Sequence, residues 1–323
     1  MKVAATESIP KIKNPSTEEF LEIWKQYQPF LVEDVVNHWG ASNNWSNDYL
    51  IKQCGNNLIP IQFFKKDFLK DYHNFACEDG YSPPKEIKFK DYIKDYIEDR
   101  EKNYDLGCYL YQVDFEEYLP EIVGDITDPG YLNRNPLVQF WFGYSSKDFT
   151  STTALHFDAA HNTFVQIRGR KRILLFPPSN YLSFYPPLKD NSGFGHHSKV
   201  NPDIPNLELF PKFPWEEKIE VILQPGEMLY IPPFWWHHVT AVDENISLSF
   251  FYDIEMGDIL KQKNLLSTIF NIVPHYLYRS FYSREALGNT ISMFKSLLSL
   301  GSFTKEIREN TEQSIRENNS NNK

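Results

Sequence analysis

The chain has few cysteines, no excess of basic residues and no long uncharged apolar run. Its three cysteines, Cys54, Cys77 and Cys108, are odd in number and widely spaced, which argues against a disulfide framework. The opening segment MKVAATESIPKIK lacks the apolar core of a signal peptide, and no stretch of apolar residues is long enough for a membrane span. We therefore expect a reduced cytoplasmic or nuclear setting and no membrane partner.

The net charge at neutral pH is -10, from 33 Lys and Arg against 43 Asp and Glu. Because binding to phosphates needs clustered cationic side chains, this balance argues mildly against a nucleic-acid binder. Aromatic residues make up 16% of the chain, and its 21 prolines outnumber its 14 glycines. This composition favours a β-rich domain with many loops over a helical bundle.

The hydrophobic pattern divides the chain into regions. Residues 1–105 mix short strands, expected at 30–35 and 58–64, with a helix expected at 89–98. From Tyr109 to Tyr252 the pattern changes to strand-length runs separated by Pro, Gly, Asn and Asp. These runs are 108–113, 138–143, 153–157, 162–168, 171–176, 219–224, 227–231, 238–242 and 245–252. Short strands at this spacing predict a sandwich or a barrel.

Beyond Asp258 the β pattern stops. Leu287, Ile291, Phe294 and Leu298 fall at helical spacing, and apolar residues between 259 and 270 indicate a preceding helix. These helices could lie on a membrane, pack on the β-domain or pair two subunits, but Pro274 interrupts an apolar stretch that is already too short to span a bilayer. The polar tail 305–323 is expected to be frayed.

The sequence His156-Phe157-Asp158 is a candidate metal-binding motif. In a strand, residues i and i+2 point to the same side, so His156 and Asp158 should project together, roughly 6–7 Å apart at Cα. A third ligand would come from another strand, and the pair His237-His238 follows Trp236 where a new strand begins. Two imidazoles and one carboxylate suit Fe(II) and leave positions open for substrates. Taken alone, the first pair is also compatible with a chance hydrogen-bonded contact.

The other histidines are less informative. Strand alternation sends only one of His237 and His238 inward, and the pattern does not say which. His161, His196 and His197 are further candidates in apparent loops, and we interpret His196 and His197 as solvated. Structural roles are expected for the remaining three, which are His38, His73 and His275.

Four segments together resemble a known family. They are Thr153 to Asp158, Asn162 to Pro178, Asn201-Pro202-Asp203 leading to Phe210-Pro211, and Pro225 to Pro232 running into Trp236-His237. Their order and spacing are similar to those of the JmjC (cupin-like) Fe(II)- and 2-oxoglutarate-dependent oxygenases. The resemblance is to the small hydroxylase branch, which includes the hypoxia-inducible-factor asparaginyl hydroxylase and the tRNA wybutosine hydroxylase. It is strong over about 100 residues and fainter from roughly 10 to 143. In this family the third ligand directly follows the tryptophan, which selects His237.

The resemblance implies a cosubstrate site around Lys171. That lysine would pair with the distal carboxylate of 2-oxoglutarate, helped by the hydroxyls of Thr153 and Tyr109, with Asn162 as a polar neighbour. The asparaginyl hydroxylase has a second asparagine where this chain has Ser249, so the two pockets differ at this position. For Tyr109, an ordinary place in the core is an equally good interpretation.

The residues around Lys171 support two interpretations. Lys171, Ile173 and Leu175 share one strand face, and a lysine among apolar neighbours is costly unless it meets an anion. Alternatively, Lys171 is one member of a solvated basic run with Arg168, Arg170 and Arg172.

The resemblance also implies a fold: a mainly β protein with a double-stranded β-helix (jelly-roll or cupin) core of two facing sheets. We expect N-terminal α/β decoration at 1–105, the JmjC core at 106–257, a helical dimerisation module at 258–304 and a disordered tail at 305–323. As in related hydroxylases, the C-terminal helices would pair two copies into a homodimer.

The implied activity is an Fe(II)/2-oxoglutarate-dependent dioxygenase, with O2 as a second cosubstrate and succinate and CO2 as co-products. Hydroxylation of a protein or peptide side chain is the preferred interpretation. The alternatives are hydroxylation of a tRNA base, demethylation of N-methyl-lysine, and a cupin-type binding protein without catalysis.

Overall fold

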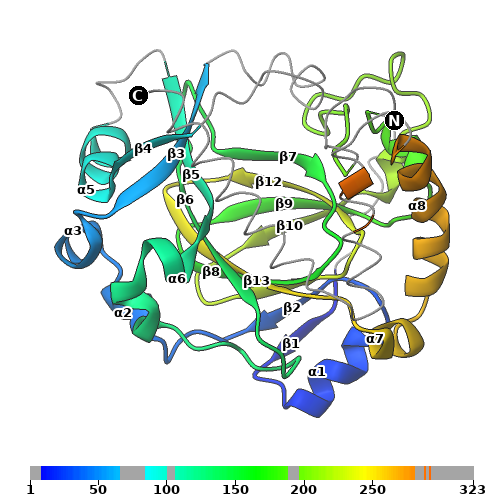
Figure 1. Cartoon of the computed structure of the whole chain (residues 1–323), viewed down its shortest axis with the longest axis horizontal. Coiled ribbons are helices and arrows are strands. Elements are labelled where there is room, and N and C mark those ends of the chain that lie inside the picture. The colour runs from blue at the N-terminus through cyan, green and yellow to red at the C-terminus, as the bar shows by residue number, and fades with distance from the viewer. Residues whose placement is uncertain are drawn as a thin grey trace.

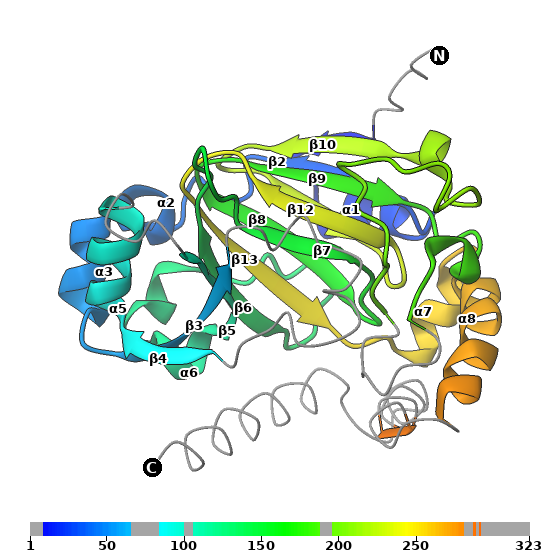
Figure 2. The ribbon, with the colours of Figure 1, turned by 90° about the horizontal axis from the view of Figure 1, so that it is seen from above.

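The computed structural model describes residues 9–65, 84–99, 106–187, 196–280, 287–288 and 291. Two β-sheets face each other and form the centre of the molecule (Figures 1 and 2). The larger sheet has nine strands, in the spatial order β1 (Lys11–Lys13), β2 (Phe30–Glu33), β11 (Met228–Ile231), β8 (His161–Arg168), β13 (Asn245–Tyr252), β6 (Leu137–Gly143), β5 (Leu106–Asp114), β3 (Leu58–Lys65) and β4 (Lys85–Lys88). The smaller sheet has four, in the order β10 (Ile219–Leu223), β9 (Lys171–Phe176), β12 (Trp236–Ala241) and β7 (Thr152–His156).

The chain passes repeatedly between the two sheets. Strand β7 lies in the small sheet, β8 in the large one, β9 and β10 in the small one, and β11, β12 and β13 then alternate. Neighbouring strands within this part are antiparallel. This is the predicted double-stranded β-helix, and the fold class is confirmed. The strand runs predicted between 108 and 252 all correspond to observed strands, although β12 begins two residues before the predicted 238–242.

Both faces of the large sheet are covered. On β13, Ile246, Leu248 and Phe250 belong to an apolar core that the sheet shares with the N-terminal helices. The alternate residues Ser247 and Ser249 are also buried, and strand alternation turns them to the other face. A second apolar core includes Ile173 and Leu175 of β9 together with residues of the large sheet. The space between the sheets is therefore apolar except where strand alternation brings in a polar side chain.

The N-terminal part packs on the core in two places. Its helices are α1 (Thr17–Trp24), α2 (Gly40–Asn44), α3 (Asn47–Cys54), α5 (Phe89–Asp91) and the π-helix η2 (Tyr92–Glu98). Helices α2, α3 and α5 lie at one end, and α1 lies beside α7 (Met256–Lys261), where Gln262 donates a hydrogen bond to the Trp24 carbonyl (Figure 1). Short helices also occur later in the chain, between the strands of the core. They are α6 (Phe115–Tyr118) and the 3-10 helices η4 (Pro120–Asp125), η5 (Tyr181–Phe184) and η6 (Trp215–Glu217). Ser16 is the N-cap of α1, and its side chain and that of Glu19 cap each other's backbone amides. The helix predicted at 89–98 is present as α5 followed by η2.

The C-terminal helices lie on the opposite side from α2, α3 and α5 (Figure 1). They are α7 (Met256–Lys261) and α8 (Leu265–Ser280). Helix α8 continues through Pro274, which interrupts the apolar stretch of the sequence but not the helix. Burial of Leu265, Ile269 and Ile272 against the core holds this helix in place and offsets the hydrogen bond that proline removes. Phe294, Leu298 and the tail 305–323 lie outside the described residues.

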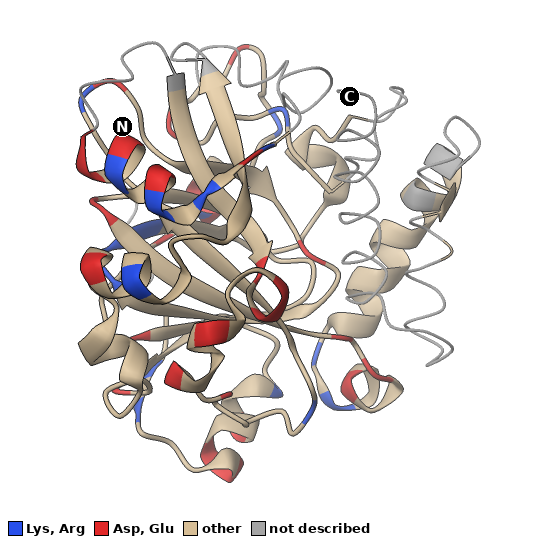
Figure 3. Ribbon diagram, turned by 60° about the vertical axis from the view of Figure 1, so that its left-hand side comes forward, with Lys and Arg blue, Asp and Glu red and all other residues tan. Residues whose placement is uncertain are grey.

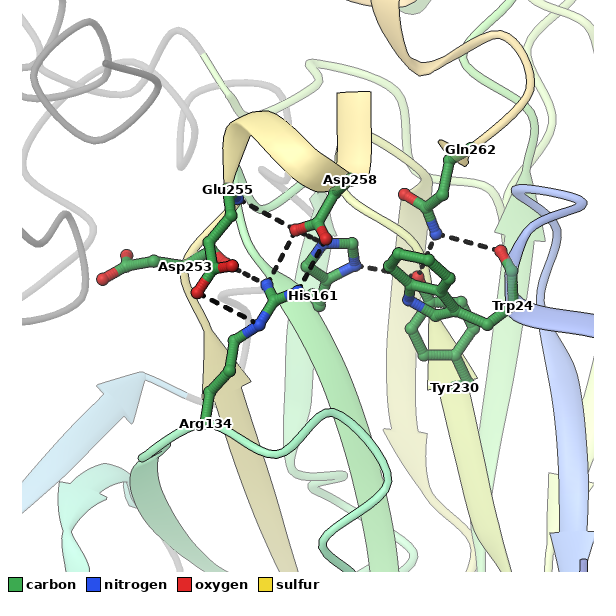
Figure 4. A network of polar contacts seen from close by, with 8 residues as sticks. All are labelled: Trp24, Arg134, His161, Tyr230, Asp253, Glu255, Asp258 and Gln262. Atoms are coloured by element: carbon green, nitrogen blue, oxygen red, sulfur yellow. Dashed lines mark hydrogen bonds and ion pairs between the residues drawn. The ribbon is translucent and has the colours of Figure 1, made fainter. Parts of the chain in front are cut away.

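A buried polar network fastens α7 to the large sheet (Figure 4). The Asp258 carboxylate accepts two hydrogen bonds from the Arg134 guanidinium, at 2.6 and 2.7 Å, and lies 3.0 Å from Nε2 of His161. Nδ1 of His161 is 2.8 Å from the Tyr230 hydroxyl, which also accepts a hydrogen bond from Gln262. Each charged group in the network has a partner, so the network can be buried at little cost.

Among the described helices, none combines the length and the apolar character needed to cross a bilayer.

Candidate metal centre and cosubstrate pocket

His156, Asp158 and His237 lie together at one end of the small sheet. His156 ends β7, and His237 is its direct partner across the ladder on β12. The two imidazole rings are therefore neighbours, with centroids 4.1 Å apart. Asp158 follows two residues after His156, and its carboxylate oxygens lie 3.9 Å from Nε2 of His156 and 3.4 Å from Nε2 of His237. One potential ligand atom from each side chain lies within 4.8 Å of the other two, so all three can contact a single ion.

Backbone carbonyls orient both imidazoles. Nδ1 of His156 is 2.7 Å from the Ala154 carbonyl oxygen, and Nδ1 of His237 is 2.9 Å from that of Trp235. Because a carbonyl only accepts, each Nδ1 donates its proton there, and the lone pair of each Nε2 is directed toward Asp158. This arrangement is typical of histidines that bind a metal through Nε2.

The protonation states also suit a cation. Burial lowers the pKa of His156 to about 3, with a further contribution from His237 nearby. Burial alone would raise the pKa of Asp158, but the neighbouring imidazoles, that of His237 above all, lower it to about 2. A neutral His156 and an ionised carboxylate are the forms that coordinate a divalent metal at neutral pH.

The neighbouring His238 faces away from this centre. Its Nε2 lies 2.9 Å from Oδ2 of Asp203, which also forms an ion pair with Arg172. Strand alternation separates the two adjacent histidines, and the structure places His237, not His238, beside Asp158.

The interpretation of His196 and His197 as solvated residues is wrong. His197 is buried, pairs with His156 in an isolated β-bridge, and has its ring stacked 5.4 Å from that of His156. His196 is half-buried, and its carbonyl accepts a hydrogen bond from the amide of Phe157. Both line the cavity that contains the metal centre. Their loop folds back onto β7, a non-local contact that strand periodicity does not reveal.

Lys171 begins β9 on the inner face of the small sheet. The turn before it requires Gly169, because a Cβ there would lie 1.9 Å from the Glu244 carbonyl oxygen. The Lys171 ammonium is buried and donates to the hydroxyls of Tyr109, at 3.1 Å, and Ser247, at 2.7 Å. Burial lowers its pKa to about 7. A buried amine whose described partners are neutral hydroxyls is a site that an anion would stabilise.

The arginines around Lys171 behave differently. Arg168, Arg170 and Arg172 each form an ion pair with an acidic side chain: Glu244, Asp243 and Asp203, respectively. Lys171 is therefore not one member of a solvated basic run.

The other predicted cosubstrate residues lie close to Lys171. Tyr109 is buried, and its hydroxyl is bonded to both Lys171 and Thr153. Thr153 and Asn162 line the cavity, as do Lys171 and the three residues of the metal centre. Tyr109 is thus both a core aromatic residue and a neighbour of the Lys171 ammonium.

Three buried polar atoms of this cavity have no hydrogen-bond partner among the described residues. They are Oδ1 of Asn162, Oγ of Ser249 and Nε1 of Trp141. Buried polar atoms are normally paired, so these three are available to a polar ligand in the cavity. With Lys171 they form a mixed set of donors and acceptors that fits a small dicarboxylate. The cavity encloses about 720 Å³, including its opening to solvent.

Sequence reasoning did not mark Trp141 as a residue of the cavity wall, and it named Ser249 only as a difference from the asparaginyl hydroxylase. A signal for Ser249 was available, because the alternation of Ser247 and Ser249 with apolar residues places small polar groups on one face of a fully buried strand. Trp141 carried no such signal, because a tryptophan in a buried strand is usually part of the core.

Comparison with known proteins agrees with this geometry. A cupin-like domain family matches residues 16–258. "JmjC domain-containing protein D" of Dictyostelium discoideum is 32% identical over 256 residues, which are 72% of this chain and 54% of that protein. "Lysine-specific demethylase 8" of Xenopus tropicalis is 29% identical over 252 residues, 76% of this chain and 53% of that protein. "tRNA wybutosine-synthesizing protein 5" of Mus musculus is 26% identical over 265 residues, 76% of this chain and 77% of that protein.

These similarities concern the domain rather than whole proteins. The chain spans about half the length of the first two of these relatives. The match nevertheless covers most of the chain, including all the strands of the double-stranded β-helix and the three residues of the metal centre. The chain therefore belongs to the cupin-like JmjC domain family.

Proposed function

We propose that this chain is an Fe(II)- and 2-oxoglutarate-dependent dioxygenase that hydroxylates a protein side chain. One observation carries the proposal: the cluster of His156, Asp158 and His237 lines the same cavity as Lys171. The Lys171 ammonium is buried, and an anion would stabilise its charged form. The cluster is a two-histidine, one-carboxylate set of the kind that holds ferrous iron on one side only. Lys171 supplies the second anchor, for the end of a dicarboxylate that lies away from the metal.

The protein groups have separate roles in this proposal. His156, Asp158 and His237 hold the metal, and none of them is needed as a general base. Lys171, Thr153 and Tyr109 bind the distal carboxylate, and Asn162 with Ser249 satisfies the remaining polar atoms of the cosubstrate. Phe164 and Trp141, whose ring centroids lie 5.0 and 5.4 Å from the Lys171 ammonium, exclude water there. Ferrous iron held by these three residues would supply the oxidation of a C–H bond to an alcohol, with 2-oxoglutarate and O2 consumed and succinate and CO2 formed.

The test begins with binding, before any substrate is known. Under anaerobic conditions, Fe(II) and 2-oxoglutarate should together give a weak visible absorption band with the wild-type chain. His156→Ala should lose both this band and oxygen-dependent succinate formation, whereas His38→Ala should retain both. Retention of band and succinate by His156→Ala would refute the ligand assignment. A wild-type chain that binds both partners but never forms succinate would instead support a binding protein of cupin type.

The relatives suggest two other substrates for the same chemistry. One relative is named a lysine-specific demethylase and another a tRNA wybutosine-synthesizing protein. Incubation with cellular peptides and with tRNA, followed by mass spectrometry, separates the cases. Hydroxylation adds one oxygen to the product, whereas demethylation releases formaldehyde. Added oxygen on tRNA, with peptides unchanged, would refute the protein-side-chain assignment.

We also propose that α8 pairs two copies of the chain. Leu266, Phe270 and Leu277 are exposed on this helix, with Phe270 69% exposed. Figure 3 shows α8 almost without charged residues, in contrast to the helices on the other side of the molecule. The double substitution Leu266→Glu, Phe270→Glu should convert a dimer to a monomer in light scattering, while Glu22→Gln on the exposed side of α1 should not. An unchanged mass for the double variant would refute this pairing.

A further inference from the structure

Strand β5 contains a bulge where it passes the cavity. Leu110 pairs with Phe142 of β6, and Val113 pairs with Phe140. Three steps along β5 therefore correspond to two steps along β6, which means that β5 has one extra residue. Within this bulge Gln112 adopts a φ of 60°, in the left-handed region that is unfavourable for a residue with a side chain.

The bulge changes which side chains reach the cavity. Leu110 and Val113 both belong to the apolar core on the outer face of the large sheet. In a regular strand Gln112 would share that face with Leu110. The extra residue instead turns Gln112 to the inner face, and consecutive residues Tyr111 and Gln112 both line the cavity. A bulge beside an active site commonly redirects a side chain in this way.

Gln112 and Tyr111 belong to the more exposed part of the cavity wall, together with Asp158, His196 and Phe251. Both are half-buried, whereas Trp141, Asn162 and Lys171 in the same wall are buried. They therefore border the open side, where a substrate must enter to reach the metal. The Gln112 carboxamide also has no hydrogen-bond partner within the described part of the chain. The left-handed backbone of Gln112 is strained, and its side chain forms no hydrogen bond within the described part of the chain that would offset this strain. Strain of this kind is typical of functional sites, which points to a role in binding.

We propose that Gln112 is a specificity-determining residue that binds an amide group of a peptide substrate beside the metal centre. This inference rests on the proposed function. A carboxamide presents one acceptor and one donor side by side, and its best complement is another amide, which the peptide group and the Asn and Gln side chains provide. Tyr111 lies next to it and packs edge-on against Trp141, with ring centroids 5.6 Å apart, forming an aromatic wall for the substrate.

The charges near the entrance favour a peptide over a nucleic acid. Lys171 is the only lysine or arginine among the described residues that line the cavity, and it is buried. Nucleic-acid binding depends on Lys and Arg contacts to phosphates, and the chain as a whole carries a net charge of -10. Among the described residues, the cavity wall therefore offers amide and aromatic groups to a substrate but no exposed lysine or arginine for a phosphate backbone.

The test uses the full chain loaded with Mn(II) and N-oxalylglycine, a 2-oxoglutarate analogue that cannot be decarboxylated. Peptides are selected on it from a random twelve-residue display library, and their Kd values are measured with the wild-type chain and variants. Gln112→Gly should weaken binding about tenfold, as expected for one lost hydrogen bond, and should raise the melting temperature because glycine accepts the left-handed conformation. Gln112→Glu, which keeps the length but loses the donor, should weaken binding similarly.

The matched control is Asn133→Gly. Asn133 also has a left-handed backbone, with a φ of 50°, but it is exposed and does not line the cavity. This substitution should leave the Kd of the peptides unchanged. Kd values within twofold of wild type for both Gln112 variants would overturn the inference. So would a wild-type chain that retains ribo-oligonucleotides but no peptides from libraries of equal diversity. The anaerobic iron band decides the proposed function separately, so a failure here with the band present refutes only the role of Gln112.

Discussion

Two consecutive residues of β8, His161 and Asn162, show two kinds of buried polar site. Both ring nitrogens of His161 have partners, Tyr230 on one side and Asp258 on the other (Figure 4). Asn162 is as well buried, but its Oδ1 has no partner among the described residues and lines the cavity. Strand alternation sends the two side chains to opposite faces of the same sheet.

The difference separates groups that stabilise the fold from groups that bind a ligand. The network of His161 has its charges paired within the chain, so removing one member leaves another buried without a partner. The polar groups around Asn162, Ser249 and Lys171 are incomplete, so they lower the stability of the unliganded chain and are completed by a ligand. Substitutions in the two regions should therefore affect stability in opposite directions.

The largest effect is expected in the network of Asp258, whose charged groups are paired. Asp258→Ala removes the buried carboxylate shared by Arg134 and His161 and leaves Arg134 with its longer ion pair to Glu255, so the free energy of unfolding should fall by about 3–5 kcal/mol in urea titrations at pH 7. The control is Asp243→Ala, whose ion pair with Arg170 is largely exposed and should be worth below about 1 kcal/mol. Equal losses for the two variants would mean that the network does not stabilise the fold.

The next largest effect concerns the metal centre. At a Mn(II) concentration of about one hundred times its Kd, binding should raise the free energy of unfolding of the wild-type chain by about 2.7 kcal/mol. Asp158→Ala removes one of three ligands and should abolish this increase in thermal unfolding experiments, without lowering the stability of the metal-free chain. Asp243→Ala serves again as the control and should retain the increase. Metal-dependent stabilisation of Asp158→Ala would show that the ion binds elsewhere.

The fold was predictable because its signals are local. Strand length, alternation and the Pro and Gly residues between the runs determine where strands begin and end, and His156 and Asp158 share a face by the same rule. The resemblance to a family was needed to choose His237 over His238. The structure supplies the physical reason, since His238 is held on the other side by Asp203.

The remainder of the site depends on contacts that are distant in sequence. His197 reaches the cavity because its loop pairs with β7, and Gln112 reaches it because of a bulge. The alternation of side chains along a strand predicts neither of these two placements. The continuation of α8 through Pro274 likewise depends on packing against the core rather than on helix propensity.

A third effect, of opposite sign, is expected for Lys171. Burial lowers its pKa from 10.5 to about 7, so between these values the unfolded chain binds more protons than the folded chain. The cost to stability is therefore complete below pH 7 and is relieved as the pH rises toward 10. Lys171→Met should raise the free energy of unfolding of the unliganded chain by about 1–4 kcal/mol at pH 6, and by less at pH 9. A difference from wild type that does not change with pH would mean that burial does not perturb this amine.

The smallest effect separates two serines of one strand. Ser247 and Ser249 are both fully buried on β13, but Ser247 accepts a hydrogen bond from Lys171 whereas Ser249 has no described partner. Ser247→Ala should lower the free energy of unfolding by about 1 kcal/mol, and Ser249→Ala should leave it unchanged or slightly higher. The order should reverse for the ligand: Ser249→Ala should weaken 2-oxoglutarate binding up to tenfold in titrations of the Mn(II)-loaded chain, because the ligand then loses a hydrogen bond. If Ser249→Ala instead destabilised the unliganded chain as much as Ser247→Ala, its hydroxyl would already be satisfied within the fold, and an unpaired atom in this cavity would no longer indicate a ligand.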